Sequence, residues 1–427
     1  MAISQNFPNT RPSLNLNFAR SKTLDPRIAF IRDQTGSEAS YVDESGIIRY
    51  ASADEPRFDH DPETGKCLGL MIEERRTNLC FYGTTIQNFT ARNSATLTAN
   101  AATAPDGTTT ATRLQSSGSG TGFYDDDDAK AYTSGKTYTF SCFFKANGTD
   151  EAVILLYGAN WTGADGVSNV LGTFDLTNGT VVSADGGTIR DPSGGAKIES
   201  YPNGSYRCSI TETCTTTHTQ IHQNIRSKGD NGDIYAWGYQ IEECSYASSL
   251  IPTTTNATAS REKEIAKIDG TNFSDFYNPS ESSIYVRFNI KGLFTSNGYN
   301  KLYEINDGTS DNRVSTLLQG TNSNIYETFI IAGTNNLTFN NSSITLGDFH
   351  QVAVGFGTSF QRYTYDASGN LDTNTDTSIG ISTFSPTQLN IGSQGSNSGR
   401  QLNGYLSQLV YYPTKLTDDQ LQNLILQ

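Results

Sequence analysis

The chain has 427 residues, of which 17% are charged, and its 44 acids against 30 bases give a net charge of −14. This length suggests about two or three domains, and the acidic balance argues against nucleic acid, whose phosphates such a surface would repel. No run approaches the roughly 20 apolar residues of a membrane span, so we expect no membrane insertion. Gly, Ser, Thr, Asn and aromatic residues take the place of the missing charges, a mix that is typical of many short strands and polar turns.

The N-terminus, MAISQNFPNTRPS, shows no charged-then-apolar signal peptide, so we expect the chain to be made and folded in a cytoplasm. Six cysteines are scattered without a CxxC pair, which predicts buried thiols and indicates neither a zinc site nor a disulfide framework. They are Cys67, Cys80, Cys142, Cys208, Cys214 and Cys244.

Residues 1–85 predict a small β-rich segment with little to bury. Leu14, Leu16 and Phe18 alternate as in a strand, and residues 43–46, DESG, favour the turn of a hairpin. Because its apolar content is thin, we expect the segment to dock on a neighbouring domain or on a partner.

The motif PRFDHDPETG in this segment places Asp59, His60 and Asp61 together, which is compatible with a catalytic or metal site. Neighbouring side chains of a strand point to opposite faces, so we favour a turn capped by the aspartates with Arg57 as counter-ion. Residues 73–76, EERR, predict a solvated or interfacial charge cluster.

Residues 86–250 predict an antiparallel β-sandwich or jelly roll. Apolar residues alternate over 138–144, 206–210 and 235–241, with Gly, Asp and Asn turns and no amphipathic helix between them. Trp237 lies on the apolar face of the last of these strands, so we expect it in the core.

Glycan recognition needs flat aromatic faces beside polar donors and acceptors, because a sugar presents C–H patches flanked by hydroxyl groups. The turn-rich stretch 158–163 offers Trp161 and Asn160, and Tyr157 precedes it, so these three are the candidate glycan-binding residues. The alternative is that Trp161 anchors the loop by packing.

Four consecutive acids, Asp125, Asp126, Asp127 and Asp128, are candidate ligands of a hard cation such as Ca²⁺. A solvated acidic loop is the alternative. No other cofactor is indicated.

After the last of the middle strands the chain loses apolar periodicity, and residues 251–264 predict a linker with nothing to bury. Residues 265–427 predict a second β-sandwich, with alternating apolar residues over 284–290. A helix follows at the end, where Thr417 and Gln420 form a capping box. The fold class is therefore all-β, with two antiparallel sandwiches of jelly-roll type preceded by a small N-terminal attachment segment.

Catalytic signatures are lacking in the sequence. On a concanavalin-like sheet a retaining glycosidase needs paired carboxylates in a Glu-x-Asp-x-x-Glu pattern, and none occurs. No GxSxG elbow serves a serine hydrolase. We therefore expect that the protein is not an enzyme.

Several blocks resemble known families. The blocks FARSKTLDPRIAFIRD (18–33) and SYVDESGIIRYASADEPRFDHDPETGKCLGLMIEERRTNL (40–79) resemble the N-terminal module of many tailed-bacteriophage virion proteins of the tail-fibre or appendage kind. The middle region resembles the carbohydrate-binding jelly rolls of phage appendages and of some glycan-degrading enzymes, through NGSYRCSIT and WGYQIEECSYASSLIPT. The ending GYLSQLVYYPTKLTDDQLQNL is similar to the last strand and helix of the laminin-G or concanavalin-like family.

The resemblance implies a non-enzymatic structural protein of the phage virion, a tail fibre, appendage or outer decoration that contacts host surface glycans. It implies that residues 1–85 attach the chain to other virion proteins and that the chain forms a homo-oligomer, since phage appendages are commonly trimers. Two alternatives stay open: a polysaccharide depolymerase of the tailspike type, and a lectin-like surface adhesin.

Overall fold

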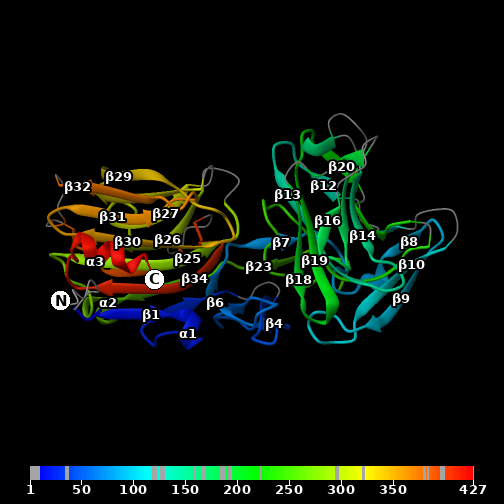
Figure 1. Cartoon of the computed structure of the whole chain (residues 1–427), viewed down its shortest axis with the longest axis horizontal. Coiled ribbons are helices and arrows are strands. Elements are labelled where there is room, and N and C mark those ends of the chain that lie inside the picture. The colour runs from blue at the N-terminus through cyan, green and yellow to red at the C-terminus, as the bar shows by residue number, and fades with distance from the viewer. Residues whose placement is uncertain are drawn as a thin grey trace, which may run out of the picture.

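The computed structural model describes residues 10–33, 38–117, 123–125, 130–157, 160–164, 169–182, 189–190, 192, 195–221, 223–229, 231–293, 298–319, 323–377, 381, 384–394 and 400–426. Figure 1 shows two β-sandwiches side by side along the long axis of the molecule. We call them the middle sandwich and the C-terminal sandwich, after the part of the chain that builds most of each. The predicted all-β fold with antiparallel sandwiches is confirmed.

Two sheets form the C-terminal sandwich, and apolar side chains such as Phe288, Ile305 and Phe356 fill the space between them. In the described residues the first sheet contains, in spatial order, β32 (Leu371–Asp376), β31 (Phe360–Tyr365), β30 (Phe349–Phe356), β25 (Ser282–Ile290), β34 (Gly404–Tyr412), β6 (Cys67–Ile72) and β5 (Phe58–His60), with β1 (Leu14–Asn17) also on β34. The second contains β2 (Ala29–Ile31), β24 (Ile265–Asp269), β33 (Gln388–Ile391), β26 (Tyr299–Asn306), β27 (Arg313–Gln319), β28 (Asn324–Ile331) and β29 (Thr334–Ser343).

The N-terminal strands are woven into this sandwich. β1 and β6 pair antiparallel with β34, and β2 pairs with β24. Leu14, Leu16 and Phe18 belong to the same core, each at most 2% exposed. Residues 10–78 have too few apolar side chains for a core of their own, and they complete the core of their neighbour.

The middle sandwich also has two sheets, with Phe140, Cys142 and Ile210 among the side chains between them. One sheet contains, in spatial order, β18 (Ala196–Tyr201), β19 (Ser205–Thr213), β13 (Thr137–Ala146), β22 (Asp233–Glu242), β10 (Ala111–Ser116) and β9 (Ala95–Ala102). The other contains β16 (Thr180–Val182), β15 (Asn169–Asp175), β14 (Glu151–Tyr157), β21 (Asn224–Ser227), β11 (Phe123–Asp125) and β8 (Thr90–Arg92), with β17 (Ile189–Arg190) also on β15.

The predicted N-terminal hairpin, β3 (Ala39–Val42) and β4 (Ile48–Ala51), docks on the middle sandwich. Phe143, which breaks the apolar alternation of β13, points outward and packs on Trp237. Val42 and Ile48 join them in a separate apolar cluster. The N-terminal strands therefore contact both sandwiches. Trp237 is buried as predicted, but it lies on the outer face with Phe143 and not in the core between the sheets, which holds Tyr239 and Ile241.

Two further strand pairs are β12 (Lys130–Tyr132) with β20 (His218–Ile221), and β7 (Arg76–Asn78) with β23 (Ala259–Arg261). The α-helices of the described residues are α1 (Phe18–Ser21), α2 (Gly270–Ser274) and α3 (Asp418–Leu424). The capping box of Thr417 and Gln420 is confirmed at α3, which packs its leucines on the outer face of the first C-terminal sheet. No helix in the described part is long and apolar enough to cross a bilayer. All six cysteines are free, and the prediction of buried thiols is confirmed for five, while Cys67 is half-buried.

Candidate functional site

A network of buried charges joins the two sandwiches. We call Arg57, Glu73, Arg261 and Glu264 the ionic joint, and all four side chains are fully buried. Glu264 accepts two hydrogen bonds from Arg57, at 2.7 Å from Nε and 2.6 Å from Nη2. Glu73 Oε2 lies 3.0 Å from Arg57 Nη2 and 3.2 Å from Arg261 Nη1. Because each buried ion costs several kcal/mol of lost hydration, such a network is stable only with every partner in place.

The joint also binds the loop that follows β22. Ser249 Oγ donates to Glu73 Oε2 at 2.6 Å. Burial disfavours the charged form of Glu73, but the charges of Arg261 and Arg57 outweigh it and hold the pKa of this carboxyl well below its usual range. Glu73 therefore stays ionised at neutral pH despite its burial.

The joint corrects two expectations from the sequence. Residues 251–264, predicted as a linker with nothing to bury, contribute Arg261 and Glu264, and their strand β23 pairs with β7. Arg57, predicted as the counter-ion of the nearby aspartates, pairs with Glu73 and Glu264 instead. Charges more than 190 residues apart in the chain meet here, which a local pattern does not reveal.

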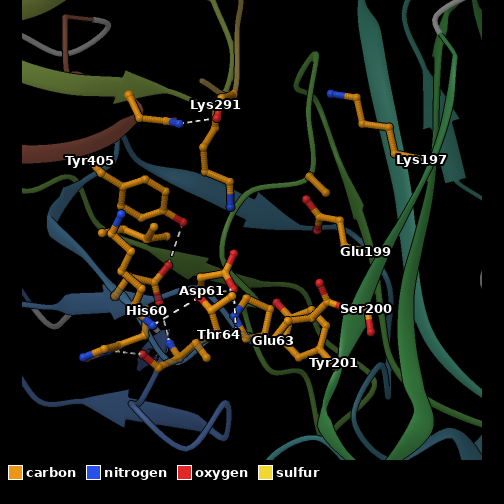
Figure 2. A pocket seen from close by; sticks show the side chains of 18 of the residues that line it. His60, Asp61, Glu63, Thr64, Lys197, Glu199, Ser200, Tyr201, Lys291 and Tyr405 are labelled. Carbon is orange, nitrogen blue, oxygen red and sulfur yellow. Dashed lines mark hydrogen bonds between the residues drawn. The ribbon is translucent and has the colours of Figure 1, made fainter. Parts of the chain in front are cut away.

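A cleft of about 620 Å³ opens beside the joint, between the two sandwiches. Its floor is the tip of the β5–β6 hairpin, one wall is β18 of the middle sandwich, and the other wall is formed where β25 ends and β30 and β34 begin (Figure 2). β18 is the edge strand of its sheet. The volume is in the range of roughly 300–1,000 Å³ that is usual for sites of small ligands.

Asp59 and His60 fix the floor by holding one residue of β3. The backbone N–H of Val42 donates to Asp59 Oδ1 at 2.5 Å, and His60 Nδ1 bonds the Val42 carbonyl oxygen at 2.9 Å. Tyr405 donates to Asp59 Oδ2 at 2.6 Å. A shift of register between Asp59 and His60 lets two neighbours on one strand reach the same partner, so the alternation expected from a regular strand does not hold here. Burial raises the pKa of Asp59 above its ordinary value.

His60 retains one ring nitrogen that no described residue satisfies. A carbonyl oxygen can only accept, so Nδ1 carries the proton and Nε2 of the neutral ring is an acceptor. Nε2 is buried and has no hydrogen-bond partner within the described part of the chain. Since buried polar atoms are normally paired, this nitrogen is available to a hydroxyl group of a ligand or to water.

The turn at the tip of the hairpin is held by Asp61. Its Oδ1 accepts hydrogen bonds from the backbone N–H of Thr64 at 2.8 Å and from Thr64 Oγ1 at 2.7 Å. Gly65 completes the turn with a φ of 66°. The favoured interpretation of the PRFDHDPETG motif, a turn capped by aspartate, is thus confirmed for Asp61.

Aromatic rings and charged groups share the walls of the cleft. Tyr201 at the end of β18 packs edge-on against Phe143, with ring centroids 5.0 Å apart, and Phe349 and Tyr405 line the opposite wall. Lys197 and Glu199 project from β18 and are exposed (Figure 2). The cleft thus combines flat apolar faces with hydrogen-bonding groups of both charges, which suits a polyhydroxylated ligand.

The predicted glycan-binding residues lie elsewhere. Trp161 is 1% exposed, and its ring packs edge-on against Tyr132 and Phe140, with centroids 5.0 and 5.7 Å away. Its Nε1 donates to the carbonyl oxygen of Tyr157 at 3.1 Å. The prediction of an exposed stacking face at Trp161 is therefore wrong, because burying the indole in the aromatic core of the middle sandwich stabilises the fold. The alternative, that Trp161 anchors the loop by packing, is correct. Tyr157 is 38% exposed and Asn160 half-buried, and neither lines the cleft.

Of the predicted Ca²⁺ ligands, the structure describes only Asp125. This residue is fully buried and pairs with Arg92 at 3.0 Å. Asp126, Asp127 and Asp128 lie outside the described residues. Among the residues that are described, no three His, Cys, Asp or Glu side chains gather as a metal site would require. Calcium binding by the acidic run stays a prediction.

Sequence reasoning missed the wall residues Tyr201, Lys291 and Tyr405. Tyr201 and Tyr405 belong to β18 and β34, and Lys291 directly follows β25, so nothing local marks the three as neighbours. A signal was nevertheless present in the distribution of charge. Charged residues are scarce in this chain, yet they concentrate in 54–66 and 261–267, two stretches that meet at the joint, and the first of them also forms the floor of the cleft.

The fold and site define an all-β protein of two antiparallel sandwiches with a ligand-sized cleft between them. No protein-family model matches the chain, and a comparison with curated proteins gives no match. Among solved structures, the carbohydrate-binding module CBM40 of the IT-sialidase from Ruminococcus gnavus, bound to α2,3-sialyllactose, shows 13% identity and a TM-score of 0.30 over 36% of this chain and 86% of that one.

The K499G mutant of the NanB sialidase from Streptococcus pneumoniae gives 13% identity and a TM-score of 0.30 over 36% of this chain, and the match spans 25% of that enzyme. The binding domain of botulinum neurotoxin serotype D/C gives 10% identity and a TM-score of 0.29, over 38% of this chain and 40% of that one. These likenesses cover little more than a third of the chain, and we draw no function from them.

Proposed function

We propose that the chain is a non-catalytic structural protein of a tailed-phage virion, a tail fibre, appendage or outer decoration, that contacts host surface glycans through the cleft between its sandwiches. The observation that supports glycan binding is the set of residues that line the cleft. Tyr201 and Phe349 offer aromatic rings for the C–H faces of a sugar, while Ser200, Glu199 and Lys291 offer groups for its hydroxyls.

The construction of the cleft supports this proposal. Its floor is pinned to β3 through Asp59 and His60, and its walls belong to sandwiches that the ionic joint locks together. A site that is held open before the ligand arrives loses little conformational entropy on binding. This matters for sugars, since each hydroxyl contact replaces a bond to water and yields little net free energy.

The virion part is supported by the resemblance of the blocks 18–33 and 40–79 to N-terminal modules of phage virion proteins. In the structure these blocks supply the β5–β6 hairpin and two of the four residues of the joint, Arg57 and Glu73. Mass spectrometry and cryo-electron microscopy of purified virions test this part. We expect the chain in the particle, as an oligomer that projects outward, and its absence from particles would contradict the proposal.

A glycan array with the intact chain tests the cleft. We expect binding to a restricted set of bacterial envelope glycans, and loss of that binding in Glu199→Trp, which fills the cleft from an exposed position on β18. Thr98→Trp, at an exposed position on β9, is the matched control and is expected to bind as the parent does. Retained binding by Glu199→Trp would remove the cleft from the proposal, and an array with no binder would remove the glycan function.

The depolymerase alternative has one observation in its favour, since Asp61, Glu63 and Glu199 place three carboxyl groups around the cleft. Glycoside hydrolysis requires two such groups on either side of the scissile bond. We expect no release of reducing ends when the chain is incubated with the glycans that it binds. Release that Glu199→Gln abolishes would replace the binding proposal by the enzymatic one.

A further inference from the structure

Lys291 provides a cation in the cleft. Its charge acts on the buried carboxyl groups of Asp59 and Glu73, and its ammonium group lies 5.8 Å from the centre of the Tyr405 ring. Its backbone N–H donates to the carbonyl oxygen of Asn403 at 2.9 Å, which fixes the start of its side chain on the C-terminal wall. The side chain is half-buried, and Figure 2 shows it directed into the cleft. Within the described residues its ammonium group forms no ion pair. Lys197, on the facing strand β18, likewise has none.

The acids at the floor of the cleft are engaged by the protein. Asp59 accepts from the backbone of Val42 and from Tyr405, and burial raises its pKa, so its negative charge is disfavoured. Asp61 uses Oδ1 to cap its own turn. Glu63 and Glu199 are exposed at the rim, where water screens them. In the interior of the cleft Lys291 is therefore a cation that no described carboxylate pairs with directly.

We propose that the cleft selects saccharides that carry an anionic group, a carboxylate or a phosphate, and that Lys291 is the residue that binds this group. This inference rests on the proposed glycan-binding function and adds its ligand class. A charge-assisted hydrogen bond from an ammonium group to an anion is about twice as strong as a neutral one, and it is strengthened where water is partly excluded. Lys197 lies on the opposite wall as a second cation, and His60 Nε2 on the floor accepts from a hydroxyl group of the same ligand.

The test uses the intact chain and matched pairs of oligosaccharides. One pair is an oligosaccharide that contains glucuronic acid and the same oligosaccharide with its carboxyl group reduced to an alcohol. The other is a phosphorylated oligosaccharide and its dephosphorylated form, so the two arms distinguish the sources of the anion. Titration calorimetry in low and in physiological salt is expected to show binding that is at least about tenfold tighter for one acidic member than for its neutral partner.

Three variants locate the effect. Lys291→Met is expected to bring the acidic member down to the affinity of the neutral one, while Lys291→Arg retains most of the preference. Lys228→Met is the control for net charge, because it removes one exposed lysine that pairs with Glu151 outside the cleft. Thermal unfolding of all variants checks that they are folded.

The outcomes separate the two proposals. Equal binding of the acidic and neutral members, or an effect of Lys291→Met no larger than that of Lys228→Met, would overturn the inference and leave glycan binding in place. Failure of every saccharide, acidic or neutral, on the array and in solution would overturn both. Preference for one acidic member that depends on Lys291 would support the inference and name the anion.

Discussion

The ionic joint and the cleft are built from the two ends of one hairpin. In the joint the charged groups are paired and buried, whereas in the described part of the cleft they are unpaired and face the solvent. Arg57 and Glu73 flank β5 and β6 at the open end, where each finds a partner of opposite charge within about 3 Å and is closed to water. At the tip of the same hairpin the cleft opens, and Lys291 and Glu199 face it without ion-pair partners among the described residues.

This difference separates the charged residues that stabilise the fold from those that are available to bind a ligand. A buried ion without its partner destabilises the fold, so the joint tolerates no loss. A charge that faces a water-filled cleft costs little to leave unpaired, and its free energy remains available for binding. Changes in the joint should therefore act on stability, and changes in the cleft on ligand affinity.

The largest expected effect is on the joint. Glu264→Gln keeps the shape of the side chain but removes the charge that faces Arg57 and Arg32, and we expect the free energy of unfolding to fall by about 3–5 kcal/mol. Urea denaturation followed by fluorescence measures it. Glu262→Gln is the control, because Glu262 pairs with the exposed Arg75 and its loss is expected to cost less than about 1 kcal/mol. An equal loss of unfolding free energy in the two variants would show that the ionic joint does not stabilise the fold more than an exposed ion pair does.

The second largest effect is expected from low pH, which should reduce the stability that the joint contributes. The pKa of Glu73 is lowered in the folded chain, below the roughly 4.3 of an unfolded glutamate, so the unfolded chain takes up the proton first as pH falls. The stability that this carboxylate contributes is complete above about pH 5 and is lost below it, by an amount on the order of 2 kcal/mol. Urea titrations at pH 7 and pH 3.5 are expected to show a smaller loss in Glu73→Gln than in the parent. An identical pH dependence in both would contradict the assignment.

Asp59 lies between the two regions, and its replacement should have an intermediate effect. Asp59→Ala leaves the backbone N–H of Val42 and the hydroxyl group of Tyr405 without their acceptor, which is expected to cost about 1–3 kcal/mol. Asp59→Asn retains an amide oxygen for one of these donors and should cost less. Thermal unfolding distinguishes the two variants. An Asp59→Ala variant as stable as the parent would show that the hydrogen bonds of Asp59 do not hold the floor of the cleft.

The smallest effect on stability is expected in the cleft. Lys291→Met and Glu199→Gln should each change the free energy of unfolding by less than about 0.5 kcal/mol, because neither forms an ion pair among the described residues and Lys291 loses only a distant contact with the Tyr405 ring. The same denaturation series measures both. A loss of more than about 2 kcal/mol in either would place that residue with the joint and weaken its assignment to the ligand.

The sequence predicted the parts of this arrangement that are set by local periodicity. Alternating apolar residues over 235–241 predicted β22, and the capping box at Thr417 predicted α3. The alternation did not place Trp237 correctly, because this residue is buried on the face opposite Tyr239 and Ile241. Trp161 shows the limit, because a tryptophan among glycines and a threonine looks exposed until the loop is seen to fold onto the aromatic core. The ionic joint could not be predicted either, because Arg57 and Glu264 are 207 residues apart and the sequence around each does not indicate its partner.

Hydrogen–deuterium exchange of the intact chain, with and without the tightest saccharide from the array, shows whether the cleft is where the ligand binds. We expect slower exchange on binding in residues 58–66 and 195–201, which form the floor and the β18 wall, and unchanged, already slow exchange in β7 and β23 at the joint. Protection confined to another surface, with the floor and the β18 wall unaffected, would contradict the assignment of the cleft as the site of contact.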